Sequence, residues 1–529
     1  MLSRRQFLLL AGEAAAGLAL PGCAASPPFR KEVFPELGDA ARPYLGLATT
    51  LREEHDYEAR VEGAVPAELR GTLYRNGPGL FDRGGLRKRA LFDGDGMVQS
   101  FRFHDDGVRY RNRFVRTPKY AEEEAAGRFI YQSWSTQAPG GFPANFWGAD
   151  NVRNQAGVTV FLRGGRLYAF DDTGLPFELD PVTLATIGRT SFGLPEDFTI
   201  YAAHSKMDPV TGEWLHFGVR YGPHPLLHIT VFDRTGGLKL HRAFPLPRYV
   251  YMHDWIVADR HVIISLHPAE IHFWGFMLGF RSLLESIRWE PARGNLLMVV
   301  EREGNGAPLF LETPASFMWH SVNACEAGGE IRADFVGYAT PDHFTGRDPV
   351  VTAVMAGRKG NYSFPGELRR YTIDPARRTV RQETLDGGNY EWPRVNELHR
   401  CHAYRIAYLA KTHPGEFFWS IITRIDMESG RTASYDFGPG VYCGEPVFVP
   451  FPGRRYRPDD PEEPGWLLSE LYDSRTRKSC LAVLRADALA DGPVATVWLR
   501  HHVPFSFHGW WSADERMPAK QVQGAGPHL

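Results

Sequence analysis

The sequence predicts an all-β fold and, within that class, a seven-bladed β-propeller. Short runs of Val, Ile, Phe, Tyr and Leu alternate with Gly, Asp, Asn and Pro turns from Val65 onward, and sustained helical periodicity is nearly absent. About twenty-five short strands are expected, and radial repetition protects the edges of that many strands. Seven blades would need roughly 65 residues each. Because no clean repeat marks them, the blade number follows from chain length alone.

Residues 1–26 predict a targeting segment that lies outside the folded domain. The stretch SRRQFL at residues 3–8 matches a twin-arginine export signal, and an apolar run follows it to Leu20. The stretch LPGC at residues 20–23 resembles a lipoprotein cleavage box, in which Cys23 becomes the lipidated first residue. Ordinary cleavage near residues 24–26 is the alternative. We therefore expect export to the periplasm by the twin-arginine route, with residues 27–529 as a single propeller domain.

After this segment the chain shows strands and turns in regular succession. Strand-like runs alternate with Gly- or Asp-rich turns, which is typical of antiparallel hairpins. Examples of the runs are residues 71–75, 98–103, 109–114 and 166–170, and examples of the turns are residues 105–107, 163–165 and 208–212.

One stretch departs from this pattern. Residues 271–289 are strongly apolar, and a helix is expected there. The stretch is too short and too interrupted by charge to span a bilayer. Two interpretations are open: an amphipathic surface that makes peripheral contact with a membrane, or a helix that packs over the propeller face and buries its own aromatic side chains.

Charge and cysteine content argue against several classes of protein. With 60 Lys and Arg against 62 Asp and Glu, the formal net charge is -2, so no basic excess attracts nucleic acid. The five cysteines are Cys23, Cys325, Cys401, Cys443 and Cys480. Because no Cys-x-x-Cys pair occurs, a zinc ribbon is not expected, and nothing indicates a disulfide framework. The aromatic content of 13% fits either a large apolar ligand or a well-packed β core.

Four short stretches each place one histidine among aromatic or small residues. They are YAAHS at 201–205, YMHDW at 251–255, MWHSVNA at 318–324 and PFSFHGW at 504–510, and their histidines are His204, His253, His320 and His508. Their separations along the chain, about 50, 70 and 190 residues, are near multiples of a blade length. We therefore expect each histidine to face the propeller axis, and all four to meet at one metal ion.

Three carboxylates occur where partners for these imidazoles are needed: Asp172, Glu391 and Glu445. A metal-bound imidazole usually donates its other N–H to a carboxylate, which fixes its tautomer and orientation. A set of four neutral imidazoles suits copper or iron better than hydrolytic zinc. Four protein ligands on an octahedral ion leave two positions free for dioxygen and water. The pattern therefore favours oxygen chemistry over hydrolysis.

The chain resembles the carotenoid cleavage oxygenases, which include apocarotenoid oxygenases, lignostilbene dioxygenases and the retinal-pigment-epithelium isomerohydrolase. The resemblance covers residues from about 40 to 515 and rests on specific motifs. They are PAELRGTLYRNGP at 66–78, FDGDGM at 92–97, YRNRFVRT at 110–117 and the four histidine stretches above.

This resemblance implies a seven-bladed propeller with one Fe(II) ion on its axis, under a cap of helices and loops. It implies that His204, His253, His320 and His508 hold the iron, and that Asp172, Glu391 and Glu445 orient three of them. The implied reaction inserts O₂ across a conjugated C=C bond of an apocarotenoid or related polyene and gives two carbonyl products. The apolar substrate would enter through a tunnel, and residues 271–289 fall near the membrane-facing entrance of the family.

Two departures from the family pattern affect the site. The family normally has Glu where this chain has Asp172, so we expect this shorter side chain to reach its histidine only through water or a shifted strand. The family commonly has Asn-Thr-Asn where this chain has residues 154–156, and Gln155 would lie near the open metal position.

Other activities stay open at this point. A lignostilbene-type enzyme would cleave a phenolic stilbene, with Lys119 as a candidate partner for the phenolate; a solvated charge at a strand end is the simpler interpretation of Lys119. The chain could instead be a metal-containing propeller that binds an apolar ligand without catalysis. Isomerisation or ester cleavage at the same iron is a third alternative within the family.

Overall fold

The computed structural model describes residues 26–30, 42–147, 153–172, 174–195, 200–222 and 224–513. Within these ranges the fold is all-β, as predicted, and its strands form seven sheets of four to six strands and two smaller ones. Thirty-six strands are present, more than the number expected from the sequence. The extra strands are mostly two- or three-residue segments, which leave almost no periodic pattern in a sequence.

Three of the larger sheets are built from the first half of the chain, except that the last strand joins one of them. One contains β2 (Asp56–Glu58), β8 (Gly107–Phe114), β7 (Asp95–His104), β4 (Gly71–Leu80) and β36 (His508–Ala513), in that order. The next contains β12 (Thr186–Arg189), β11 (Phe177–Leu179), β10 (Arg166–Phe170) and β9 (Thr159–Arg163). The third contains β13 (Lys206–Met207), β14 (Trp214–Arg220), β15 (Leu226–Phe232) and β16 (Leu238–Pro245).

The other four larger sheets follow in chain order. The first contains β17 (Ile256–Val257), β18 (His261–Leu266), β21 (Asn295–Glu301) and β22 (Leu309–Thr313), and the second contains β23 (Phe317–Ala327), β24 (Glu330–Tyr338), β25 (Glu367–Asp374) and β26 (Thr379–Asp386). The third contains β27 (Tyr390–Arg394), β28 (Ile406–Lys411), β29 (Ile421–Asp426) and β30 (Thr432–Asp436). The fourth contains β3 (Arg60–Gly63), β35 (Pro493–Trp498), β34 (Lys478–Arg485), β33 (Gly465–Asp473) and β31 (Val441–Cys443), with β32 (Val447–Pro450) also paired to β33.

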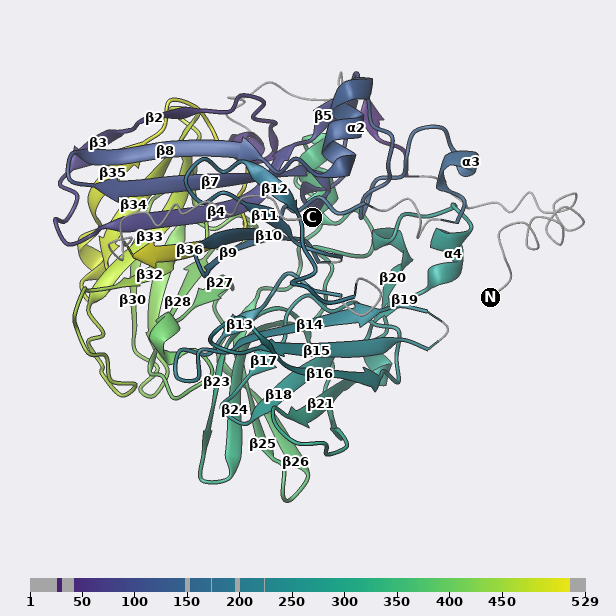
Figure 1. Ribbon diagram of the computed structural model, residues 1–529, viewed down its shortest axis with the longest axis vertical. Coiled ribbons are helices and arrows are strands. Elements are labelled where there is room, and N and C mark those ends of the chain that lie inside the picture. The colour runs from purple at the N-terminus through teal and green to yellow at the C-terminus, as the bar shows by residue number, and fades with distance from the viewer. Residues whose placement is uncertain are drawn as a thin grey trace, which may run out of the picture.

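The two ends of the described chain meet in shared sheets. The last strand, β36, pairs antiparallel with β4, so that His508 lies opposite Asn76. The early strand β3 likewise pairs antiparallel with the late strand β35. Figure 1 shows the purple N-terminal strands beside the yellow C-terminal ones. These long-range pairings bring the histidine stretch at residues 504–510 back to the start of the fold.

Helices occupy a small part of the fold and lie in the connections between strands. They are α2 (Pro118–Ala126), α3 (Phe142–Asn145), α4 (Phe273–Met277) and α5 (Val350–Ala353), with 3₁₀ turns η2 (Pro43–Ala48), η3 (Leu91–Asp93), η5 (Leu284–Ser286), η6 (Pro291–Arg293), η7 (Val354–Ala356), η8 (Glu397–His399) and η9 (Leu489–Asp491). Among the described residues the longest α-helix is α2. Its N-cap is Thr117, whose side chain accepts a hydrogen bond from the N–H of Tyr120, and its C-cap is Gly127 in the left-handed conformation. Both are normal helix-terminating devices.

The prediction of a helix over residues 271–289 was wrong for most of that stretch. It holds the end of β19 (Ala269–Ile271), the five-residue α4, the turn η5 and the strand β20 (Ile287–Trp289), which pairs with β19. Glycines and charged residues interrupt the apolar run, so no helix propagates through it. Among the described residues, no helix has the length and hydropathy needed to cross a membrane.

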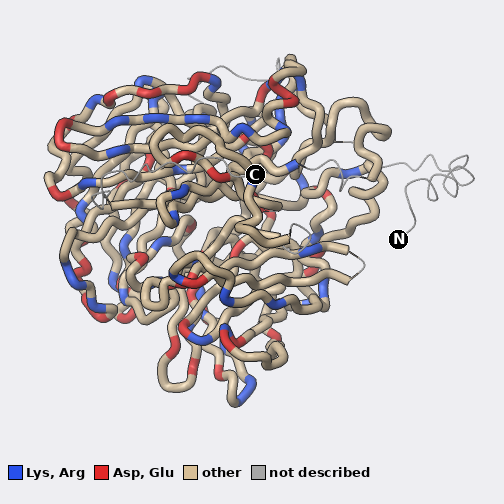
Figure 2. The backbone as a smooth tube through the Cα atoms, in the orientation of Figure 1, with Lys and Arg blue, Asp and Glu red and all other residues tan. Residues whose placement is uncertain are grey.

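Charged residues of both signs are interspersed along the chain (Figure 2). This distribution agrees with the formal net charge of -2. Within the described part of the chain, Cys325, Cys401, Cys443 and Cys480 are free thiols.

Candidate metal centre and its pocket

The structure brings the four predicted histidines together in one buried cluster. One nitrogen from each of His204, His253, His320 and His508 lies within 4.8 Å of the others. The ring centroids of His204 lie 4.5 Å from those of His253 and His508 and 5.1 Å from that of His320. The prediction that these residues converge is therefore confirmed.

Each histidine reaches the cluster from a strand, or from the segment just before a strand, of a different sheet. His320 lies within β23 and His508 is the first residue of β36, whereas His204 and His253 lie in the segments just before β13 and β17. Small or aromatic neighbours let these segments pack closely: the indole N–H of Trp255 donates to the carbonyl oxygen of His204 at 2.9 Å.

Three carboxylates hold three of the imidazoles from behind. Distances from Nδ1 to the nearest carboxylate oxygen are 2.9 Å for His253 and Asp172, 2.5 Å for His320 and Glu391, and 2.9 Å for His508 and Glu445. Because each carboxylate accepts the Nδ1 hydrogen, each Nε2 is left as the free lone-pair donor. The geometry therefore matches the predicted role of all three carboxylates.

Asp172 contacts His253 without an intervening group. Of the two routes expected for this shorter side chain, water or a shifted strand, the one through water is not needed. The hydroxyl of Tyr251 also donates to the same carboxylate oxygen at 2.7 Å. The backbone N–H of Asp172 donates to Asp171 at 2.8 Å, which fixes the strand end from which the carboxylate projects.

The environment favours neutral imidazoles at two of the four positions. Burial, reinforced by the neighbouring imidazoles, lowers the pKa of His204 well below its usual range. Burial also lowers the pKa of His508 to about 3, against the opposing effect of Glu445. At His320 burial acts in the same direction, but Glu391, together with Asp254 and Glu445, outweighs it and raises the pKa. Metal ligation requires the neutral form and would compete with this proton.

The donor set fits a transition-metal ion. Nε2 of His320 is buried and has no partner among the described residues. Nε2 of His204 and Nε2 of His253 face each other at 2.9 Å. At least one of these two nitrogens carries no hydrogen and presents its lone pair to the other. Metal–imidazole bonds of about 2.1 Å place neighbouring nitrogens at such separations. A cation at the centre would satisfy both the orphaned nitrogen and the facing pair.

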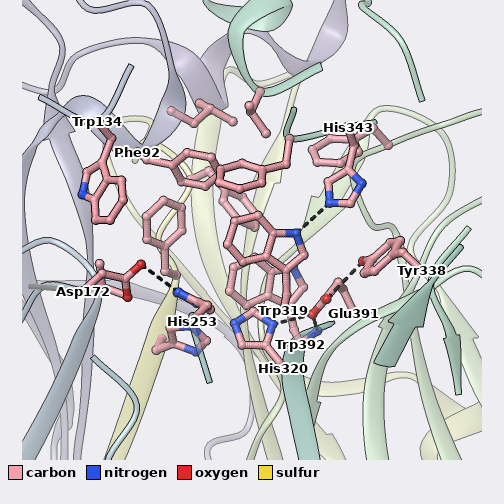
Figure 3. A pocket seen from close by; sticks show the side chains of 18 of the residues that line it. Phe92, Trp134, Asp172, His253, Trp319, His320, Tyr338, His343, Glu391 and Trp392 are labelled. Carbon is pink, nitrogen blue, oxygen red and sulfur yellow. Dashed lines mark hydrogen bonds and ion pairs between the residues drawn. The ribbon is translucent and has the colours of Figure 1, made fainter. Parts of the chain in front are cut away.

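An aromatic pocket opens directly onto this cluster. Most of its lining side chains are aromatic or aliphatic, as is usual in small-molecule sites. Figure 3 shows Trp134 and Asp172 on one side of the pocket and Tyr338 and His343 on the other, with His320 near its base. The lining also includes Leu91, Phe92, Tyr251, Trp319, Phe344, Val351, Trp392, Phe417, Phe418, Trp419, Phe505 and Phe507.

Two residues of this site were missed by the sequence reasoning. Tyr251 binds Asp172 as described, and the hydroxyl of Tyr338 donates to Glu391 at 3.0 Å. Tyr251 stands two positions before His253, so its place in the histidine stretch was a usable signal. Tyr338 ends β24 and comes from no stretch of special composition, so its role depends on sheet packing alone.

Neither interpretation of Lys119 was correct. Its side chain is fully buried near the start of α2, with Nζ 2.5 Å from Asp95 and 3.0 Å from Glu123. It is therefore not a solvated charge, and it does not line the aromatic pocket. Lys119 neutralises two buried carboxylates instead.

Gln155 is buried beside the pocket wall without lining it. Its backbone N–H donates to Asp171 at 2.7 Å, and its side-chain amide donates to the carbonyl oxygen of Phe92 at 3.1 Å. Both partners line the pocket. Gln155 thus supports two wall residues from behind.

Comparisons with known proteins agree with this geometry. A family model described as "Retinal pigment epithelial membrane protein" matches residues 47–513. The chain is 32% identical to apocarotenoid-15,15'-oxygenase from Synechocystis sp., covering 87% of this chain and 94% of the relative. It is 28% identical to lignostilbene-alpha,beta-dioxygenase isozyme III from Sphingomonas paucimobilis, covering 89% and 97%. A solved structure of cobalt-substituted Synechocystis apocarotenoid oxygenase superposes with a TM-score of 0.82 at 30% identity, covering 90% of this chain and 100% of that one.

Proposed function

This chain belongs to the family of the retinal pigment epithelial membrane protein, the carotenoid cleavage oxygenases, and we propose its function on that premise. The chain is an oxidoreductase that cleaves a conjugated C=C bond of an apocarotenoid or related polyene with O₂. The reaction consumes one O₂ for each double bond and gives two carbonyl products. The observation that carries this proposal is the cluster of four imidazoles at the base of an aromatic pocket.

One Fe(II) ion per chain is the proposed metal, held by His204, His253, His320 and His508. Bound there, it supplies the one-electron chemistry that makes O₂ reactive toward an alkene. Asp172, Glu391 and Glu445 keep the Nδ1 hydrogens of three ligands directed away from the centre. In this arrangement no carboxylate ligand neutralises the cation.

The protein side chains position the alkene and exclude water. Trp319 packs edge-on against His253, with ring centroids 4.9 Å apart, and Trp392 lies 5.1 Å from both His320 and His508. Flat aromatic walls beside the imidazoles suit a planar conjugated chain. A site of this kind also limits water, which would otherwise quench reactive oxygen species.

The proposal is tested by incubating iron-loaded protein with a polyene panel in a sealed oxygen-electrode cell. We expect one O₂ consumed per two carbonyl products identified by mass spectrometry. Product formation without oxygen would instead indicate isomerisation or ester cleavage at the same centre. Full iron occupancy with no turnover of any conjugated alkene would favour a non-catalytic propeller that binds an apolar ligand.

Cleavage of phenolic stilbenes is the second candidate, because the Sphingomonas relative carries the name lignostilbene dioxygenase. The role first considered for Lys119 no longer supports it, since that side chain is buried away from the pocket. Stilbenes with and without a para-hydroxyl group belong in the same panel. A kcat/KM for the phenol well above that for every polyene would favour this activity.

The seven larger sheets are the proposed blades of a closed propeller. Support comes from the pairing of the last strand β36 with β4 and of β3 with β35, which join chain ends as ring closure requires. The proposed cap over the metal consists of the connections that carry α2 to α5. These connections supply Trp134, Phe344 and Val351 to the pocket.

Export by the twin-arginine route to the periplasm, with Cys23 as lipid anchor, is proposed from residues 1–25, which lie outside the described residues. Ser26 is buried, and its N–H donates to Gln137 at 2.6 Å, so this last residue of the predicted targeting segment packs against the folded domain. Peripheral membrane contact is proposed at α4, where Trp274 is 74% exposed. Mass spectrometry of the mature N-terminus, together with cell fractionation of Cys23→Ser, tests the anchor.

A further inference from the structure

A second cavity lies against the aromatic pocket and has the opposite character. It is bordered by the β19–β20 region on one side and the segment before α5 on the other. Its lining residues include Arg89, Arg281, Arg288, Arg347 and Arg358. We call this cavity the arginine groove.

The groove and the pocket share a wall one side chain thick. Phe344 lines both cavities. Trp134 lines the pocket, whereas the next residue, Ser135, lines the groove. The backbone N–H of Leu284, a groove residue, donates to the carbonyl oxygen of Trp134 at 2.8 Å. Phe344 therefore separates an aromatic surface from a cationic one.

The positive charge of the groove is not balanced by its own acids. Asp348 is engaged by Arg358 through two contacts of 2.6 Å. Glu285 accepts hydrogen bonds from Ser26 and Ser282. Within the described residues, no ion pair is formed by Arg281, Arg288 or Arg347. Three guanidinium groups are thus available to a ligand.

Two further donors line the groove without a partner. The hydroxyl of Ser135 is buried and has none among the described residues, and the side chain as a whole is 3% exposed. The indole N–H of Trp289 is also buried and without a partner there. A site lined by five arginines and two acidic residues, with a hydroxyl and an indole donor, is complementary to an anion.

We propose that the arginine groove binds the anionic end, a carboxylate, of the polyene substrate whose conjugated chain lies in the aromatic pocket. This inference rests on the proposed function for the identity of the conjugated chain. Arg281, Arg288 and Arg347 attract the carboxylate, and the hydroxyl of Ser135 and indole N–H of Trp289 complete its hydrogen bonds. The substrate class is therefore a polyene acid, and the groove sets which end of it remains outside.

Binding of a matched ligand pair tests the proposal without requiring turnover. A polyene carboxylic acid and its methyl ester are titrated into iron-loaded protein under nitrogen, and quenching of tryptophan fluorescence gives Kd. We expect the acid to bind about tenfold more tightly at low ionic strength, as for charge-assisted hydrogen bonds in a partly exposed site. The difference should shrink as salt is added, because screening weakens it.

Variants assign the effect to the groove. The triple variant R281Q/R288Q/R347Q should lose the preference for the acid and keep the Kd of the ester. Arg377→Gln, which removes an arginine that is 81% exposed in the turn between β25 and β26, serves as the matched control. Ser135→Ala should weaken the binding of the acid and leave that of the ester unchanged, although this variant retains the full charge of the groove. Equal Kd values for acid and ester in the unmodified protein would overturn the proposal.

Further outcomes separate this inference from its alternatives. If the acid and the ester bind with equal Kd and both are cleaved, the oxygenase function is supported and the groove has no part in substrate recognition. Arginine-dependent binding of the acid without cleavage of either ligand supports the groove and contradicts the proposed function. Vesicles of neutral or anionic phospholipid are tested in parallel. Loss of binding to anionic vesicles in the triple variant, with no acid preference, would assign the groove to lipid headgroups instead.

Discussion

Oδ2 of Asp172 lies 2.9 Å from Nδ1 of His253 and also accepts the hydroxyl hydrogen of Tyr251 at 2.7 Å. This shared acceptor joins the wall of the aromatic pocket to the histidine cluster. Because both donors meet one oxygen, a change in the carboxylate should affect the orientation of the imidazole and of the phenol together.

Asp172→Ala should lower metal affinity roughly 10- to 100-fold, because His253 loses the group that fixes its tautomer. Asp172→Asn keeps an acceptor of similar size, so its metal affinity should lie between those of the wild type and Asp172→Ala. Competition with a chelator, followed by metal analysis, measures the affinities. Asp459→Ala removes a carboxylate that is 58% exposed and should have no effect. Unchanged affinity in Asp172→Ala would contradict the assigned role.

His320→Ala should lose bound metal and activity together, because only three imidazoles would remain at the centre. Its partner Glu391 would be left buried without the imidazole, so folding is checked by circular dichroism. His413→Ala alters a histidine whose side chain is 42% exposed and should retain metal. A folded His320→Ala protein with one metal per chain would rule out this ligand set.

Lys119→Met should lower the free energy of unfolding by about 3 kcal/mol, the cost of leaving buried carboxylates short of a cation. Arg83 lies 3.2 Å from Asp95 and limits the loss. The ratio of kcat/KM for phenols and polyenes should stay constant. Denaturant titration and the substrate panel measure the two quantities, with Lys359→Met, 67% exposed, as control. A selective loss of phenol turnover would return Lys119 to the substrate site.

Glu463 should make the protein less stable as pH rises. Burial raises the pKa of its carboxyl from 4.5 to about 8, and the hydroxyl of Tyr408 donates to it at 3.1 Å. Between these values the unfolded chain releases this proton and the folded chain keeps it. The unfolded state then binds fewer protons, so the free energy of unfolding falls with rising pH, by up to about 1.4 kcal/mol per unit.

Glu463→Gln removes this titration and should flatten the pH dependence between pH 5 and about 8. Denaturant titrations at several pH values, with wild type and variant in parallel, isolate the contribution of this one group. Identical slopes for the two proteins would show that the carboxyl is already ionised in the folded state.

Much of the metal centre could be predicted from the sequence. His204, His253, His320 and His508 were identified because each sits in a short stretch of small and aromatic residues that is itself distinctive. Glu391 and Glu445 were identified on similar grounds, and both now lie within hydrogen-bonding distance of a cluster histidine. Local sequence carried this information because each of these side chains needs a tightly packed strand or turn around it.

The distances between side chains from different strands could not be predicted. The reach of Asp172 was judged from its length, whereas the position of its strand end decides the contact with His253. Lys119 was judged from its polarity, whereas Asp95 and Glu123 make its burial tolerable. The helix expected over residues 271–289 failed because an apolar stretch does not distinguish a helix from a short buried hairpin.

By itself, the sequence determined the all-β class, the four histidines of the cluster and the carboxylates that bond to three of them, since strand alternation and local motifs depend on neighbouring residues. Only the tertiary structure decided that an aromatic pocket and an arginine groove share Phe344, and that β36 closes onto β4. Those relationships join residues far apart in the chain, and the packing of complete sheets fixes them.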